Sequence, residues 1–265
     1  MKNVAFVAPY LAETTLRFVA AVAGLPGVRT AVLSCDPPER VPEAIRKQID
    51  AFHRLPSGLD PSEILSAVKG AHQAWGGIDR LLGALEELQV PLGHIRDTLG
   101  IPGMSAETAD NFRDKSKMKR VLREAGLPCA RYALAHSPED AHAFAGSIGY
   151  PLIAKPPAGS GARSTFRLES DQDLVGCLRA LPPAPDRPVL LEEFITGDEF
   201  SFDSISLDGR VVWHSINHYL PTPLEVLREP WIQWCVLQPR EVDDPLYGEI
   251  KPVAGAALTA LGMDT

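Results

Sequence analysis

The sequence predicts an α/β protein. Residues 1–103 are expected to form a parallel sheet with helices, and the region that follows mixes helices with antiparallel hairpins. In the first region, apolar strand patterns alternate with helical periodicity, which is typical of doubly wound sheets. In the second region, strands are joined by turn signals, of which Asp208-Gly209 favours a two-residue hairpin turn. The composition, 45% hydrophobic and 23% charged, is that of a globular chain.

The first region contains short apolar runs that predict strands at residues 3–9, 29–35 and 78–84. Periodic apolar residues and helix-terminating glycines predict helices at residues 14–23, 42–51, 61–75 and 85–92. The run Gly100-Ile101-Pro102-Gly103 ends this region, because glycine and proline together interrupt regular structure.

The second region opens with a helix that Asn111 or Asp114 can cap and that Gly126 closes. One face of this helix is basic and carries Lys115, Lys119 and Arg123. Further helices are expected after the N-cap residues Ser137 and Ser170 and over residues 247–261. Strands are expected at residues 151–155, 165–168 and 189–194, followed by the hairpin at Asp208.

Charge and cysteine content exclude several classes of protein. The net charge is −8, from 26 basic and 34 acidic residues, so a general nucleic-acid binder is not expected. The four cysteines form no CxxC pair, which indicates reduced thiols and neither a disulfide framework nor a zinc ribbon. The longest apolar run, residues 252–263, is shorter than the roughly 20 residues that span a bilayer. With no signal-peptide pattern, a cytoplasmic protein without a membrane partner is expected.

Lys155 is the first residue that could carry chemistry. It ends an apolar strand and precedes a glycine-rich loop at residues 158–164, an arrangement suited to binding phosphate through a cation and free backbone amides. The alternatives are a surface lysine and an exposed hairpin tip. A nicotinamide fingerprint is disfavoured, because the loop is followed by a strand and not by a helix.

Acidic residues form the second candidate. Glu192 and Glu193 interrupt an apolar strand and Glu199 follows a glycine, so these side chains could receive an amino group or ribose hydroxyls. The alternative is a solvated strand end. His214 and His218 are four residues apart on an expected strand, roughly 13 Å from each other, which argues against a zinc pair.

Taken together, these segments resemble the ATP-grasp superfamily, in the branch of carboxylate–amine and carboxylate–thiol ligases related to biotin carboxylase. The resemblance covers essentially the whole chain and depends on the order and spacing of its motifs. The matching motifs are DKSKMK at 114–119, AGLP at 125–128, YPLIAKP at 150–156, the loop 158–164, VLLEEFI at 189–195, GDE at 197–199, Asp203, and Asp208-Gly209.

The resemblance implies a domain order and a set of ATP contacts. Residues 1–103 would be a pre-ATP-grasp domain, 104–188 a linker helix with the small ATP-grasp subdomain, and 189–265 the start of the C-terminal subdomain. Lys115 and Lys155 would hold the phosphates, and Gly159, Ser160 and Gly161 would form a flap over them. The Glu192 side chain and the backbone of Phe194 and Ile195 would meet adenine, and Glu199 would bond the ribose.

One part of the family pattern is missing. The acidic and asparagine ligands of magnesium in this superfamily follow the region of Glu199, and residues 200–265 contain no match for them. We therefore expect an ATP-grasp domain that is incomplete at its C-terminal end, with Mg²⁺ ligands beyond residue 265 and none assigned within the chain. No catalytic residue is assigned.

The predicted function is an ATP-dependent carboxylate–amine ligase that works through an acyl phosphate, with a small carboxylate and an amine as substrates and a homodimer as its assembly. One alternative is a non-catalytic ATP-binding fragment or module of the same fold. The other is an oxidoreductase built on residues 1–100, and the turn at residues 9–14 argues against it because it contains no glycine.

Overall fold

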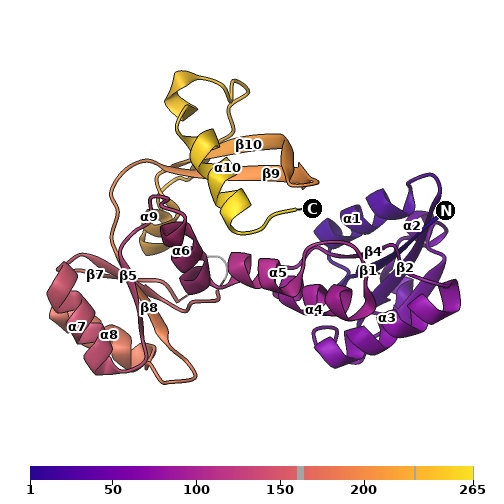
Figure 1. Cartoon of the computed structure of the whole chain (residues 1–265), viewed down its shortest axis with the longest axis horizontal. Coiled ribbons are helices and arrows are strands. Elements are labelled where there is room, and N and C mark those ends of the chain that lie inside the picture. Colours follow the sequence, from indigo (N-terminus) through magenta and orange to yellow (C-terminus); the bar gives the residue numbers. More distant parts are fainter. Residues whose placement is uncertain (160–163, 230, 265) are drawn as a thin grey trace. The chain divides into compact units, whose positions relative to one another are not determined.

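The computed structural model describes residues 1–159, 164–229 and 231–264. The chain separates into two compact units, Met1–Arg113 and Asp114–Thr265, and each is described by itself (Figure 1). The boundaries predicted after residues 103 and 188 follow the domain order of the family that the sequence resembles. The division into compact units does not test them, so they stay predictions.

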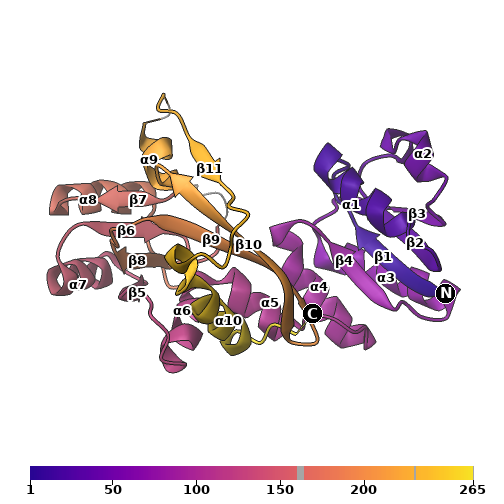
Figure 2. The ribbon, with the colours of Figure 1, turned by 90° about the horizontal axis from the view of Figure 1, so that it is seen from above.

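The first unit is built on a four-stranded parallel sheet, as the sequence predicts (Figure 2). The strand order is β3-β2-β1-β4. The strands are β1 (Lys2–Val7), β2 (Val28–Ser34), β3 (Ala51–Arg54) and β4 (Arg80–Gly83). The helices are α1 (Glu13–Ala23), α2 (Glu43–Arg46), α3 (Pro61–Trp75), α4 (Gln89–Leu99) and α5 (Ala106–Arg113), with 3-10 turns at Pro38–Arg40 and Glu86–Leu88.

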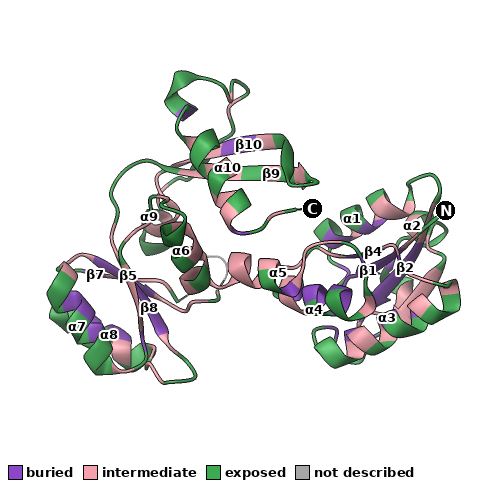
Figure 3. Ribbon diagram, viewed as in Figure 1, coloured by how far each residue is buried: buried purple, intermediate pink, exposed green. Residues whose placement is uncertain are grey.

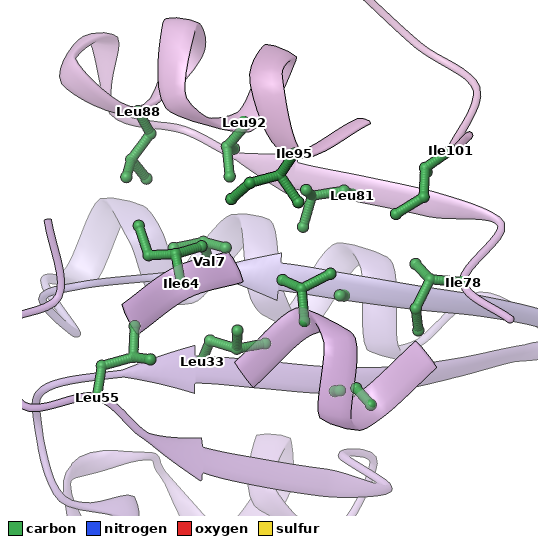
Figure 4. Packing of buried hydrophobic residues seen from close by; sticks show 14 residues of the cluster. Val7, Leu33, Leu55, Ile64, Ile78, Leu81, Leu88, Leu92, Ile95 and Ile101 are labelled. Carbon is green, nitrogen blue, oxygen red and sulfur yellow. The ribbon is translucent and has the colours of Figure 1, made fainter. Parts of the chain in front are cut away.

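Alternate residues of the central strands enter two separate cores, because successive side chains of a strand point to opposite faces. On one face, Val7, Leu33 and Leu81 pack with residues of α3 and α4 (Figure 4). On the other, Phe6 and Val32 pack with residues of α1 and α2. Both faces of the sheet are therefore covered by helices, and the central strands are buried along most of their length (Figure 3).

Two predictions for this unit are wrong. Residues 42–51 were expected to be one helix, but α2 spans only Glu43–Arg46 and the edge strand β3 begins at Ala51. Asp50 joins β3 to β2, because its carboxylate accepts from the Thr30 N–H at 2.8 Å and its own N–H donates to the Thr30 carbonyl at 3.0 Å. This tertiary pairing overrides the local helical periodicity.

The second error concerns residues 85–113. A helix was expected at residues 85–92, but the α-helix of this region, α4, spans Gln89–Leu99. The next helix, α5, was not expected. Pro91 is tolerated in α4 because the N–H groups of the first helical turn have no intrahelical partner. The helix ends at Gly100, which adopts a left-handed conformation with φ of 63°.

The second unit contains a four-stranded antiparallel sheet of order β5-β8-β6-β7. Its strands are β5 (Tyr132–Ala135), β6 (Leu152–Lys155), β7 (Phe166–Leu168) and β8 (Val189–Glu193). One face is packed against the two helices α7 (Pro138–Ile148) and α8 (Asp171–Ala180), with Phe144, Leu152, Leu174 and Leu191 in the core. Ser137 and Ser170 cap these helices, as the sequence predicts.

A second, three-stranded sheet of order β11-β10-β9 follows. Its strands are β9 (Glu199–Leu207), β10 (Arg210–Leu220) and β11 (Cys235–Leu237), and the remaining helices of the unit are α6 (Lys115–Glu124), α9 (Pro223–Arg228) and α10 (Ile250–Ala260), with a 3-10 turn at Pro245–Tyr247. The hairpin predicted at Asp208-Gly209 is confirmed: both residues have positive φ, 50° and 71°, as a primed turn requires. The short elements α9 and β11 were not predicted.

Candidate functional site

Glu192 and Lys155 are brought together by the pairing of β6 with β8. Ile153 lies opposite Glu192, so Lys155, two residues further on, projects from the same face of the sheet. The Lys155 ammonium lies 2.6 Å from Glu192 Oε2, and Glu192 as a whole is only 6% exposed. The face opposite α7 and α8 therefore carries a buried carboxylate paired with a lysine.

A second lysine reaches the same carboxylate from α6. Lys119 Nζ lies 3.0 Å from Glu192 Oε1, 5.8 Å from the centre of the Tyr132 ring and 3.7 Å from Cys129 Sγ. The contact with Oε1 is an ion pair without hydrogen-bond geometry, so this buried oxygen keeps its capacity to accept a hydrogen bond. Glu192 thus bridges two ammonium groups and leaves the cluster with a net positive charge.

Lys115, one helical turn before Lys119, is placed by the N-cap of α6. The Asp114 carboxylate accepts from the backbone N–H groups of Ser116 and Lys117. Burial opposes ionisation of Asp114, but the hydrogen bonds from Ser116 and Lys117 outweigh it and lower its pKa. Lys115 is thereby held at the first position of the helix.

Lys115 is tied to the glycine-rich loop by two bonds. Its N–H donates to the Pro157 carbonyl at 3.0 Å, and its ammonium donates to the Gly159 carbonyl at 2.8 Å. Lys115 and Gly159 are thus in contact, and their predicted role at the phosphates stays a prediction. Ser160 and Gly161, predicted to continue the flap, lie outside the described residues.

The end of β8 presents backbone groups beside the buried carboxylate. The Phe194 N–H donates to the Pro151 carbonyl at 3.2 Å, but Pro151 has no N–H with which to return the bond. Among the residues that the structure describes, the Phe194 carbonyl and the Ile195 N–H have no backbone partner. Ile195 is 64% exposed, so this strand end can meet the polar edge of a ligand.

Glu199 starts β9 and is exposed. Partial desolvation and the nearby carboxylate of Glu225 in α9 raise the pKa of Glu199. No described contact joins Glu199 to Glu192 or to the lysines, so its predicted place in the same site stays a prediction.

Known proteins resemble the part of the chain that holds these residues. Residues 114–199, which hold these lysines and acids, match the family model described as "Carbamoyl-phosphate synthase L chain, ATP binding domain". The chain is 30% identical over 180 residues to the L-arginine-specific L-amino acid ligase of Bacillus subtilis. It is 28% identical over 225 residues to the carbamoyl phosphate synthase large chain of Mycobacterium sp. (strain JLS). Residues 114–199 therefore carry an ATP-binding domain of the ATP-grasp superfamily.

The fold of this ATP-grasp chain matches solved structures along nearly its whole length. The L-amino acid ligase from Bacillus licheniformis superimposes with a TM-score of 0.77 at 21% identity, over 99% of this chain and 61% of that one. The biotin carboxylase domain of 2-oxoglutarate carboxylase from Hydrogenobacter thermophilus gives 0.70 at 16% identity, over 98% and 58%. Both likenesses confirm the predicted fold class.

The ATP-grasp chain is shorter than the proteins that it resembles. The alignment with the Bacillus subtilis ligase covers 66% of this chain and 43% of that protein, and the alignment with the mycobacterial large chain covers 80% and 19%. Across residues 1–159, 164–229 and 231–264, no three His, Cys, Asp or Glu side chains are grouped so that they could bind a metal ion. None of the helices in this part of the ATP-grasp chain has the length and apolar character needed to cross a bilayer.

Two residues of this ATP-grasp site were missed by sequence reasoning. Lys119 was noted only as part of a basic helix face and of the DKSKMK motif. Tyr132 was not considered; the centre of its ring lies 5.8 Å from the Lys119 ammonium and 5.5 Å from the Arg123 guanidinium carbon. The spacing of Lys115 and Lys119, four residues apart on a helix, is a signal that both can face one ligand. The contact between Lys119 and Glu192 depends on tertiary packing, and the sequence carried no signal for it.

Proposed function

We propose that the face of β6 and β8 which carries Glu192 binds ATP. The observation that carries this proposal is the buried Glu192 carboxylate. It is held by Lys119 and Lys155, and its Oε1, although ion-paired with Lys119, accepts no hydrogen bond from the residues that the structure describes. A buried carboxylate without a full set of hydrogen bonds is costly. The amino group of adenine would supply the missing donor.

The backbone at the end of β8 fits the rest of the adenine edge. A ring nitrogen of adenine can accept from the Ile195 N–H, and the exocyclic amino group can donate to the Phe194 carbonyl as well as to Glu192. Guanine carries a carbonyl oxygen in place of that amino group. The donor and acceptor pattern of this strand end therefore favours adenine over guanine.

The lysines would hold the phosphates. Lys115, Lys155 and the backbone of the glycine-rich loop at Gly159 offer positive charge and N–H donors, which suit a triphosphate. The resemblance to ATP-grasp ligases implies that Ser160 and Gly161 would also meet the phosphates and that Glu199 would bond the ribose. ATP, when bound, supplies a phosphoryl group that activates a carboxylate as an acyl phosphate for attack by an amine. The role of these residues is to position the phosphates and neutralise their charge.

The reaction class follows from the relatives. The L-amino acid ligases and carbamoyl phosphate synthases named above support an ATP-dependent carboxylate–amine ligase, with small-molecule carboxylate and amine substrates. Mg²⁺ belongs to this proposal, because the Hydrogenobacter thermophilus domain was solved with MgADP. That domain is also described as a dimer, which supports a homodimer. The four free thiols support a cytoplasmic location.

The competing function is an ATP-binding module without chemistry. The full-length protein, supplied with MgATP, a mixture of L-amino acids and hydroxylamine, distinguishes the two. A ligase forms ADP only when a carboxylate is present, and hydroxylamine traps the activated carboxylate as a hydroxamate that mass spectrometry detects. ATP binding with neither ADP nor hydroxamate would favour the module.

A further inference from the structure

One face of the β9–β10 pair carries a continuous polar strip. Strand alternation and the register of the two strands place six polar side chains on this face. They are Glu199, Ser201, Asp203, Ser215, Asn217 and Tyr219. The opposite face is largely apolar and aromatic, with Phe200, Phe202 and the fully buried Ile216. The strip starts at the residue proposed to meet the ribose.

Asn217 organises the centre of the strip. Its Nδ2 donates one hydrogen bond to Asp203 Oδ2 at 2.6 Å and one to Ser201 Oγ at 3.0 Å. Because a carboxylate only accepts, the contact with Asp203 fixes which end of the Asn217 amide is the nitrogen. The Tyr219 hydroxyl donates to Ser201 Oγ at 3.1 Å, so Ser201 accepts two bonds.

The network leaves acceptors without donors. Among the described residues, the second oxygen of Asp203 and the amide oxygen of Asn217 have no hydrogen-bond partner. The Ser215 hydroxyl, directly across from Asp203, also has no described partner, although Ser215 is only 6% exposed. Asp203 itself is exposed, so a ligand can reach the carboxylate that Asn217 holds in place.

We propose that Asp203 and Asn217 form the subsite for the ammonium group of an amine substrate, an inference that rests on the proposed ligase function. An ammonium group offers three donors and one positive charge, which match the free oxygens of Asp203 and Asn217. Phosphate and carboxylate groups are disfavoured, because Asp203 and Glu199 on the same face repel them. A divalent cation is disfavoured, because it needs more oxygen ligands than one carboxylate and one amide provide.

The stacked pair of Tyr219 and Trp234 lies at one end of the strip, with ring centres 6.1 Å apart. Trp234 is 47% exposed and offers an apolar surface beside the polar network. The subsite therefore suits an amine with a hydrocarbon substituent, such as an amino acid derivative, better than free ammonia.

The test uses the ¹⁵N-labelled full chain and two probes, one with a charged amine and one in which the same amine is acetylated and uncharged. L-Alaninamide carries the ammonium group, and N-acetyl-L-alaninamide does not. We expect L-alaninamide to shift the side-chain amide signals of Asn217, and the acetylated probe to leave them in place. Equal shifts with both probes, or none with either, would overturn the assignment.

Two matched variants test whether the negative charge of Asp203 is needed to bind L-alaninamide. Asp203→Asn keeps the shape of the side chain and should weaken L-alaninamide binding by about tenfold or more, as expected when a charged hydrogen bond is lost. Asp208→Asn makes the same change of charge at the hairpin turn, where asparagine tolerates a positive φ, and should leave the affinity unchanged. An unchanged affinity in Asp203→Asn, or an equal loss in both variants, would refute the proposal.

A titration with MgATP on the same sample distinguishes the amine subsite from the proposed nucleotide site. Shifts at Lys115 and Gly159 with MgATP, without any effect of L-alaninamide at Asn217, would refute the amine subsite and leave the proposed nucleotide site intact. If MgATP also fails to bind, both the proposed function and the amine subsite are refuted.

Discussion

Glu192 is expected to stabilise the second unit through its charge. The substitution Glu192→Gln keeps the size of the side chain and removes the negative charge that Lys119 and Lys155 share. At an effective dielectric constant of about 20, unit charges at the observed distances of 2.6 and 3.0 Å attract by roughly 6 kcal/mol per pair. Desolvation of the three side chains offsets most of this attraction.

The exposure of the two lysine side chains limits how much stability Glu192→Gln can lose. Removing one partner of a buried ion pair costs about 3–5 kcal/mol, and the two lysine side chains here are 15% and 21% exposed. The loss therefore lies near the lower limit, and we expect Glu192→Gln to reduce the free energy of unfolding by about 3 kcal/mol. Urea unfolding followed by tryptophan fluorescence measures it, because Trp213, Trp231 and Trp234 all lie in the second unit.

Glu193→Gln is the matched control. This neighbouring carboxylate pairs with Arg131, whose side chain is 59% exposed, so the loss should be clearly smaller than for Glu192. Equal stability losses in the two variants, or no loss in Glu192→Gln, would refute the view that the buried carboxylate holds the lysine cluster together.

Three further predictions concern single side chains. Asp114→Ala should cost about 1 kcal/mol in urea unfolding, because it removes the N-cap of α6, and an unchanged midpoint would contradict this. Because partial desolvation and Glu225 raise the pKa of Glu199, ionisation of Glu199 opposes folding. Glu199→Gln should therefore raise the melting temperature at neutral pH and lose this advantage as the pH falls below the ordinary glutamate range, about pH 4. Iodoacetamide should modify the exposed Cys235 first and Cys177 last, since burial raises the pKa of the Cys177 thiol to about 11; peptide mass spectrometry of the native chain measures the order, and early modification of Cys177 would contradict it.

Local signals in the sequence predicted local structure well. The Asp208-Gly209 turn, the caps at Ser137 and Ser170 and the strand that ends at Lys155 depend on nearby residues, and all are confirmed. The helix expected at 42–51 is wrong, because Asp50 and the strand after it pair with β2, about twenty residues earlier in the chain. A single sequence carries no direct record of such pairing.

In the candidate site, too, single residues were predicted from the sequence, but the contacts between them were not. Lys155 and Glu192 were predicted as separate features, but their ion pair depends on the register between β6 and β8. Lys119 joins them only through the packing of α6. The network of Asp203 and Asn217 likewise requires the register between β9 and β10. The turn signal at Asp208-Gly209 constrains this register, but a bulge between Val211 and Trp213 changes it.

Lys155 is proposed to belong to an ATP site, and calorimetry tests this assignment most directly. MgATP is titrated into the unchanged chain, into Lys155→Ala and into the control His218→Ala. His218 serves as the control because it stacks on Phe200, on the apolar face of the β9–β10 pair. We expect Lys155→Ala to weaken binding by about tenfold or more, because a charged contact to phosphate is lost, and His218→Ala to bind like the unchanged chain. Equal affinities in the two variants would contradict the assignment.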